Sequence, residues 1–306
     1  MRSGAGQVGA VVAVMSLLAG CANFEAASGF AKESAALAAS ARPEFEVLAG
    51  LCAEQAGVHR LLMLNRAGQQ GDPLTVQGDC RGYQGASEAL VVQSLDVLAL
   101  YAKTLAALAD DHPTDLGDDL ASLGSKLSGL KDGAGSAVFD STRVEAVTAL
   151  ADELAAIATR QERSAGIRQL VAVLPQLQAQ LRVLRGYFAV DGGVPPYARY
   201  LRYVARVRQA NESELDDWIA SGREPLRATE LKLQSGEVAA HKIAPRLADG
   251  SDSLRAAMVS AIDAWLVASE RFAQQAFTRD GKQAFSELRS LRKELQTLKR
   301  RVDAAQ

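Results

Sequence analysis

The sequence predicts an all-α protein, folded as an elongated bundle of antiparallel helices with no sheet. Alanine and leucine recur throughout the chain whereas aromatic residues make up only 5%. This composition favours closely packed helices over sheets, which prefer β-branched and aromatic residues. From residue 22 onward, apolar residues return at spacings of three and four between Gly, Pro and Asp breakers, as helices require. The 306 residues, 48% of them hydrophobic, suffice for a substantial core.

Residues 1–20 have the pattern of a secretory signal peptide. Arg2 supplies a positive start, an apolar run covers 8–18, and the small residues Ala19 and Gly20 follow. The run is shorter than the roughly 20 apolar residues of a membrane-spanning helix. At its end, Leu18-Ala19-Gly20-Cys21 resembles the lipobox of bacterial lipoproteins.

This resemblance implies that the signal peptide is removed before Cys21 and that Cys21 carries a diacylglyceryl thioether. Several acyl chains give durable membrane anchoring where one chain is marginal. Ala22 is not the Asp that favours inner-membrane retention in enteric lipoproteins, so the resemblance implies the outer membrane, facing the periplasm. A plain signal peptide and an uncleaved anchor are the alternatives.

The cysteine count agrees with this assignment. Of three cysteines, Cys52 and Cys80 are left once Cys21 is assigned to lipid. In an oxidising compartment they are predicted to form a disulfide, which closes a loop of about 28 residues and stabilises by roughly 3–4 kcal/mol. A metal or redox site would need a Cys-x-x-Cys spacing or several nearby histidines, and only His59 lies close in sequence. We therefore expect no metal and no cofactor.

The first half of the mature chain is predicted as a lipidated N-terminus with a stalk or first helix, 21–42, followed by the first part of the bundle, 43–190. Pro43 occupies a plausible first helical position. Thr142 and Glu145 match a capping box for a helix running towards 162. A helix over 164–190 contains Pro175, which is expected to kink or split it. Further helices are predicted over 43–67, 83–110 and 115–130.

The second half of the bundle is predicted over 191–306, after a Gly- and Pro-rich loop. A long helical region covers 197–243, with an interruption near Gly222. The helix over 253–278 is expected to be capped by Asp252 or Ser251. The basic C-terminal helix carries an apolar stripe that predicts packing on its own bundle, with a partner helix or a second copy as the alternative. The stripe consists of Leu288, Leu291, Leu295, Leu298 and Val302.

One candidate binding surface emerges from the charges. Helical spacing places Arg199, Arg202 and Arg206 on one side of a helix, and guanidinium groups suit phosphate and carboxylate partners. An envelope protein, peptidoglycan or anionic lipid would fit. The alternatives are a solvated face or an internal acidic partner, the cluster Asp110, Asp111, Asp115, Asp118 and Asp119. A net charge of -2 argues against nucleic acid.

Catalytic motifs are missing from the sequence. Neither His-Glu-x-x-His nor Gly-x-Ser-x-Gly occurs, and the three histidines are far apart in the chain. We therefore expect a membrane-anchored, non-enzymatic binding or scaffolding module of the cell envelope. The alternative is an enzyme or small-ligand receptor whose site is assembled between helices.

Overall fold

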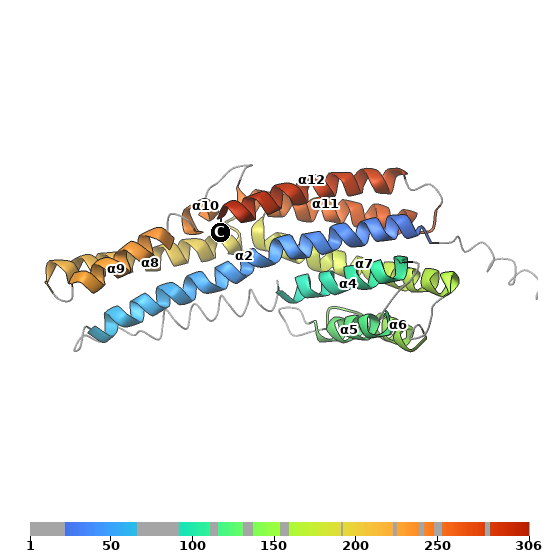
Figure 1. Cartoon of the computed structure of the whole chain (residues 1–306), viewed down its shortest axis with the longest axis horizontal. Coiled ribbons are helices and arrows are strands. Elements are labelled where there is room, and N and C mark those ends of the chain that lie inside the picture. The colour runs from blue at the N-terminus through green and yellow to red at the C-terminus, as the bar shows by residue number, and fades with distance from the viewer. Residues whose placement is uncertain are drawn as a thin grey trace, which may run out of the picture.

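The computed structural model describes residues 22–65, 92–110, 116–130, 137–153, 159–190, 192–222, 225–238, 242–247, 253–278 and 282–305. This part of the chain is an elongated helical bundle without a sheet, which confirms the predicted fold class (Figure 1). Its helices are α2 (Phe24–Asn65), α4 (Gln93–Ala109), α5 (Leu116–Gly129), α6 (Ser141–Glu153), α7 (Arg160–Phe188), α8 (Pro196–Ala220), α9 (Pro225–Val238), α10 (Ala244–Leu247), α11 (Leu254–Gln275) and α12 (Lys282–Ala305).

Helix α2 is the longest of the described helices, and its bounds show that the predicted first helix boundary is wrong. It runs unbroken for 42 residues through Pro43, which lies inside the helix and not at its first turn. A helix of this length spans about 63 Å. Proline removes one backbone donor, but packing along both sides of the helix outweighs this local cost. The predicted division between 21–42 and 43–190 therefore falls within one helix.

Two helix starts also differ from the expected caps. At the start of α6, the Asp140 side chain accepts from the backbone N–H groups of Thr142 at 3.0 Å and Arg143 at 3.3 Å. Thr142 is thus inside the helix, and the expected capping box with Glu145 is wrong. At the start of α11 the cap is Ser253, which accepts from Ala256 N at 3.1 Å, and not Asp252 or Ser251.

A capping box does occur at the start of α7. Thr159 accepts from the backbone N–H of Glu162, whose carboxylate accepts from Thr159 N at 2.6 Å. Helix α7 then continues through Pro175 to Phe188, so the proline does not split it. The predicted interruption near Gly222 is confirmed, because Gly222 has a φ of 71° between α8 and α9. Glycine adopts this left-handed conformation without the penalty that a Cβ brings.

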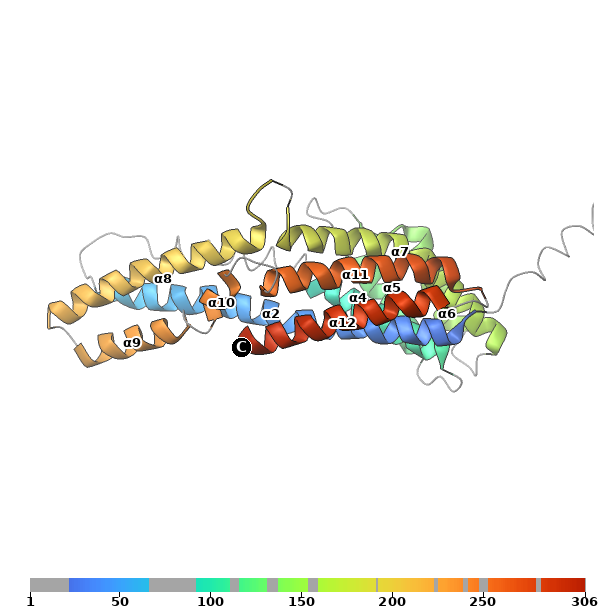
Figure 2. The same cartoon turned by 90° about the horizontal axis from the view of Figure 1, so that it is seen from above.

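Helices α2 and α12 run parallel, which departs from the antiparallel arrangement predicted for the bundle, whereas α11 runs antiparallel to α2 as predicted. Arg292 binds Glu33, and Leu288 lies against Gly29, so both α2–α12 contacts join residues with the same sequence offset. Against α11, Asn23 contacts Ala276 and Ser34 contacts Trp265, so the order reverses. Seen from above, α11 and α12 lie side by side over the N-terminal half of α2 (Figure 2).

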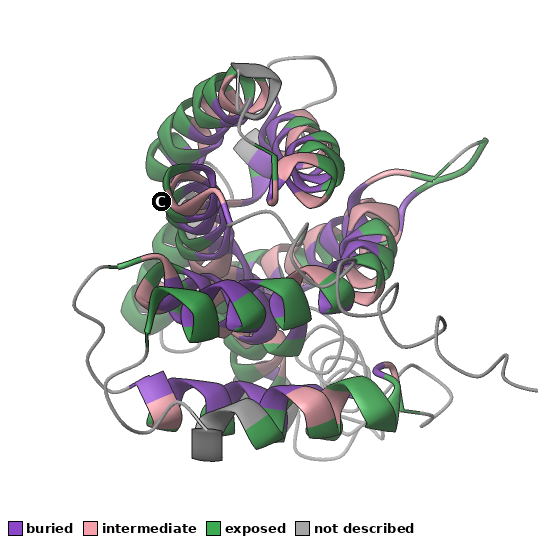
Figure 3. Cartoon of the chain, turned by 90° about the vertical axis from the view of Figure 1, so that its right-hand side faces the viewer, coloured by how far each residue is buried: buried purple, intermediate pink, exposed green. Residues whose placement is uncertain are grey.

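The apolar stripe of α12 is buried in its own bundle, which confirms the preferred prediction. Leu291 and Leu298 are fully buried, and Leu288, Leu295 and Val302 are at most 6% exposed. The stripe packs on α11 and α2. Figure 3, coloured by burial, shows the helices turning buried faces inward and exposed faces outward.

Two hydrophobic clusters divide the core unequally. The main cluster joins α2, α4, α5, α6, α7, α11, α12 and the first part of α8, whereas a small cluster of Leu62, Leu215, Trp218 and Ala228 joins the far end of α2 to the last part of α8 and to α9. Helices α11 and α12, from the predicted second half, belong to the main cluster with α2 and α7. The segments before and after residue 190 are therefore interleaved in space, and their behaviour as separate units stays a prediction.

Candidate functional site

Helix α8 presents two chemically different faces. Its inward face consists of Tyr197, Tyr200, Leu201 and Val204, all buried. The arginine stripe, defined as Arg199, Arg202 and Arg206, lies on the outward face, and all three side chains are exposed. The seven helical rises from Arg199 to Arg206 make the stripe about 10 Å long. The predicted surface is therefore accessible.

The stripe differs from the other arginines nearby in having no ion-pair partner among the described residues. By contrast, Arg182 binds Glu270 at 3.2 Å, and Arg185 binds Asp263 at 2.6 Å. Arg208, on α8 itself, binds Glu212. Of these arginines, those of the stripe are therefore the ones whose guanidinium groups form no ion pair with another described residue.

The acidic cluster does not serve as the partner of the stripe within the described residues. Asp119 is 9% exposed and binds Lys103 at 2.7 Å, within the α4–α5 pair. Asp110 ends α4, and Asp118 is exposed in the first turn of α5. Asp111 and Asp115 lie outside the described residues. The internal-partner alternative therefore receives no support from Asp110, Asp118 or Asp119.

The contacts of α8 fix how far the stripe lies from the start of α2. Tyr197 and Tyr200 bind Glu44 and the carbonyl of Leu48, in the middle of α2. At 1.5 Å per residue, Leu48 is about 36 Å along α2 from Phe24. Helix α8 continues from there towards the end of α2 (Figure 2). The stripe is therefore remote from the end of the bundle at which residue 22 lies.

A fully buried ion pair holds α8, α10 and the C-terminus onto α2. Glu44 accepts from Arg246 Nη2 at 2.8 Å, from Arg246 Nε at 2.9 Å and from the Tyr197 hydroxyl at 2.8 Å. Arg246 Nη1 also donates to the carbonyl of Ala305 at 2.7 Å. Burial raises the pKa of Glu44, and the bonds from Arg246 and Tyr197 oppose that rise. Because Arg246 and Tyr197 donate hydrogen bonds to both carboxylate oxygens of Glu44, this group is a structural centre.

His59 belongs to the same interface. Its Nδ1 lies 3.2 Å from Asn211 Oδ1, and Asn211 donates to the carbonyl of Gln55 at 3.0 Å. His59 is thus a hydrogen-bonded interface residue. No group of three or more His, Cys, Asp or Glu suited to a metal occurs in the described part of the chain.

The start of α2 is fixed directly into the bundle, so the described residues from 22 onward form no stalk. The backbone N–H of Ala22 donates to Ser164 Oγ at 3.1 Å, and that of Asn23 donates to the carbonyl of Ala276 at 2.7 Å. Ala22 is only 5% exposed. Of the two possibilities predicted for 21–42, the described residues form a first helix.

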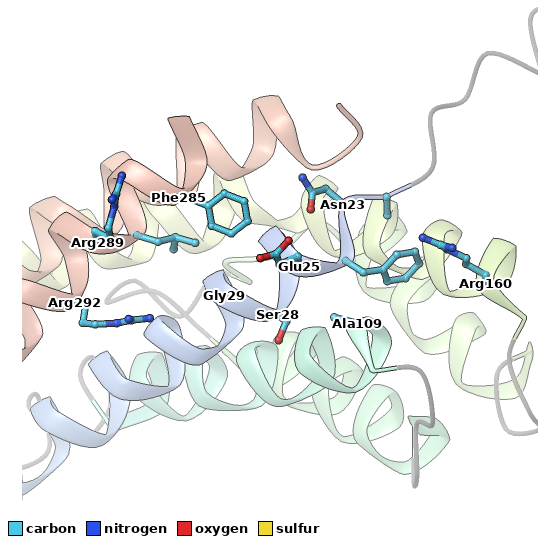
Figure 4. Close-up of a pocket in the computed structure, with 12 residues that line it drawn as sticks. Asn23, Glu25, Ser28, Gly29, Ala109, Arg160, Phe285, Arg289 and Arg292 are labelled. Carbon is cyan, nitrogen blue, oxygen red and sulfur yellow. The ribbon is translucent and has the colours of Figure 1, made fainter. Parts of the chain in front are cut away.

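A groove of about 1130 Å³ opens beside this fixed start. We call it the head groove. It is lined by α2, α12, α4 and α7, with Phe24 and Phe285 as its aromatic residues. Arg160 lies at one end, and Arg289 and Arg292 lie at the other (Figure 4). The Arg160 guanidinium stacks 5.3 Å from the centre of the Phe24 ring.

Cys52 is buried, 3% exposed, in the second half of α2. Cys21 and Cys80 lie outside the described residues, so the lipid on Cys21 and the Cys52–Cys80 disulfide stay predictions. No helix in the described ranges combines the length and apolarity needed to span a bilayer. Comparisons with protein-family models, with curated proteins and with solved structures find no match.

The buried Glu44–Arg246 ion pair and the head groove were not predicted from the sequence. Glu44 and Arg246 are separated by 202 residues, and nothing local distinguishes them from surface charges. Tyr197 and Tyr200 share the face of α8 opposite to the stripe, and this spacing was a partial indication that polar groups are buried there. The groove depends on residues from four helices, and no linear pattern marks it.

Proposed function

We propose that this chain is a lipoprotein tethered through Cys21 to the outer membrane and that its helical body scaffolds or binds another envelope component without catalysis. The observation that carries the binding role is the arginine stripe, exposed and without an ion pair among the described residues. A guanidinium group is more weakly hydrated than an ammonium group, and its planar fork binds carboxylates in a bidentate manner. The envelope component that we propose as the partner of the stripe is therefore rich in carboxylates.

The position of the stripe supports a partner beyond the anchoring bilayer. If the body stands upright on its tether, the stripe lies more than about 30 Å above the membrane surface. Electrostatic attraction to anionic lipid falls off within a Debye length of about 8 Å. Peptidoglycan and acidic envelope proteins remain within reach.

Charge reversal tests this role. The variant Arg199→Glu/Arg202→Glu/Arg206→Glu is compared with Lys293→Glu/Lys299→Glu/Arg300→Glu, which reverses the same number of exposed charges on α12. Isolated peptidoglycan is used in a pelleting assay, and crosslinking in living cells detects protein partners. The proposal predicts that the α8 variant alone loses pelleting or a specific crosslinked partner. Equal behaviour of both variants and the wild type in both assays would refute the binding role of the stripe.

The alternative of an enzyme or small-ligand receptor assembled between helices stays a proposal of lower rank. The head groove, at about 1130 Å³, is slightly larger than the roughly 300–1,000 Å³ of typical small-molecule sites. Its lining brings arginines and Glu25 together, but it holds no histidine or cysteine among the described residues. A thermal-shift screen of anionic metabolites tests this alternative, since a ligand at 100 times its Kd stabilises the folded state by about 2.7 kcal/mol.

A further inference from the structure

We propose that the head groove is a membrane-contact surface that receives the anionic phospholipid headgroups of the bilayer holding Cys21. This inference rests on the proposed function, because it requires lipidation of Cys21. It gives the orientation of the helical body on the bilayer: the start of α2 lies on the membrane, and the α8–α9 end points away from it.

The link between Cys21 and the bundle is short. Cys21 is joined directly to Ala22, and consecutive Cα atoms are 3.8 Å apart. Ala22 and Asn23 are held by Ser164 and the carbonyl of Ala276, so no slack follows the acylated residue. Ala22 itself lines the head groove. A lipid-bearing sulfur at position 21 therefore brings the groove to the level of the headgroups.

The charged lining of the head groove is mostly basic. Three arginines and one glutamate, Glu25, contribute its charged lining. Arg292 binds Glu33 at 2.6 Å, but Arg160 and Arg289 are exposed and form no ion pair with another described residue. Phosphate oxygens suit such guanidinium groups. Two available cations therefore face the position where the phosphates of the bilayer lie.

The head groove also contains a pair of aromatic side chains. Phe24 and Phe285 come from α2 and α12, and both side chains are partly exposed. Figure 4 shows Phe285 and Glu25 extending into the space between these helices. Phenylalanine on a basic surface is typical of segments that lie at the boundary between headgroups and acyl chains. Charge and apolar area thus point to one occupant, an anionic bilayer surface.

The experiment uses the processed, lipidated protein reconstituted into vesicles, with phenylglyoxal as a water-soluble reagent that modifies accessible arginines. Modification of Arg160, Arg289, Arg199 and Arg202 is followed by peptide mass spectrometry in vesicles with phosphatidylglycerol and in vesicles of phosphatidylcholine alone. Each juxtaposed arginine contributes roughly a fivefold gain in affinity for an anionic surface. We expect Arg160 and Arg289 to react at least fivefold more slowly in the anionic vesicles, with Arg199 and Arg202 unchanged.

Two outcomes would overturn the proposal: equal rates for Arg160 and Arg289 in both vesicle types, or equal protection of all four arginines, which would indicate a body lying flat. A matched pair of variants sharpens the result. Arg160→Gln should accelerate modification of Arg289 in anionic vesicles about fivefold, whereas Arg202→Gln should leave it unchanged. The same digest reports the mass of the N-terminal peptide, so a missing lipid on Cys21 is distinguished from a failed headgroup contact.

Discussion

Arg246 and Glu44 form an ion pair in which neither side chain is exposed to solvent, with Arg246 Nη2 at 2.8 Å from Glu44 Oε2. Their sequence separation is 202 residues. The pair joins the middle of α2 to α10 and, through the carbonyl of Ala305, to the end of α12. Several distant segments therefore depend on one buried contact.

Removing one partner of this pair should be strongly destabilising. Glu44→Gln leaves the Arg246 guanidinium charged and uncompensated in the core, and such changes cost about 3–5 kcal/mol. The double variant Glu44→Gln/Arg246→Met should recover part of that loss. Urea unfolding followed by circular dichroism measures both values. As a control, Arg182→Gln at an exposed ion pair should cost less than about 1 kcal/mol. Equal losses for the buried and exposed pairs would contradict the assignment.

Gly124 should be intolerant of any side chain. A Cβ at this position would lie 2.3 Å from Thr148 Oγ1, so α5 and α6 approach too closely for alanine. We expect Gly124→Ala to destabilise by about 1–3 kcal/mol. The double variant with Thr148→Ala should recover most of the loss.

Gly57 offers the matched control, since nothing lies within 4 Å of a Cβ placed there on α2. Alanine is a better helix former than glycine, so Gly57→Ala should stabilise by about 0.5–1 kcal/mol. The same urea experiment measures both glycine variants. A stabilising Gly124→Ala would show that α5 and α6 are not in the described contact.

The capping box of α7 should contribute a pH-dependent part of the stability. Bonding to the backbone N–H of Thr159, and then to its side chain, lowers the pKa of Glu162 below its usual value of 4.5. A lowered pKa means that the contribution is complete above pH 4.5 and is lost as the pH falls through the folded-state pKa. The stability difference between wild type and Glu162→Gln should therefore shrink below pH 4.5. A difference independent of pH would contradict a charged Glu162 in the cap.

The predicted disulfide has a direct chemical test. Because Cys52 is buried, thiol titration is made on the unfolded chain, with and without reductant. We expect the oxidised chain to show neither Cys52 nor Cys80 as a free thiol. Reduction should cost roughly 3–4 kcal/mol. If both cysteines react as free thiols without reductant, the predicted disulfide is wrong.

The sequence patterns predicted helices well because each helix carries its own periodicity and breakers. The α8–α9 break could be predicted from Gly222, and burial of the α12 stripe could be predicted from leucine spacing. Pro43 could not be interpreted locally, because packing along the whole of α2 decides whether the helix continues. Thr142 and Thr159 both begin a Thr-x-x-Glu pattern, and only Thr159 caps a helix. The neighbouring Asp140 competes successfully at the other site.

One property of the candidate site could likewise be predicted from the sequence, and another could not. Exposure of Arg199, Arg202 and Arg206 follows from amphipathic spacing on one helix, and this was predictable. Availability depends on whether distant acids reach each arginine, and only the assembled bundle decides that. Nothing in the local sequence distinguishes Arg182 and Arg185 from the arginine stripe, yet Glu270 and Asp263 of α11 bind them. The head groove likewise exists only where four helices meet.

The mass of the mature N-terminal peptide shows whether Cys21 carries lipid. We expect a peptide that begins at Cys21 and bears the added mass of a diacylglyceryl group, with or without an acylated amine. A mature chain that begins elsewhere, or an unmodified Cys21 in the membrane fraction, would contradict this expectation.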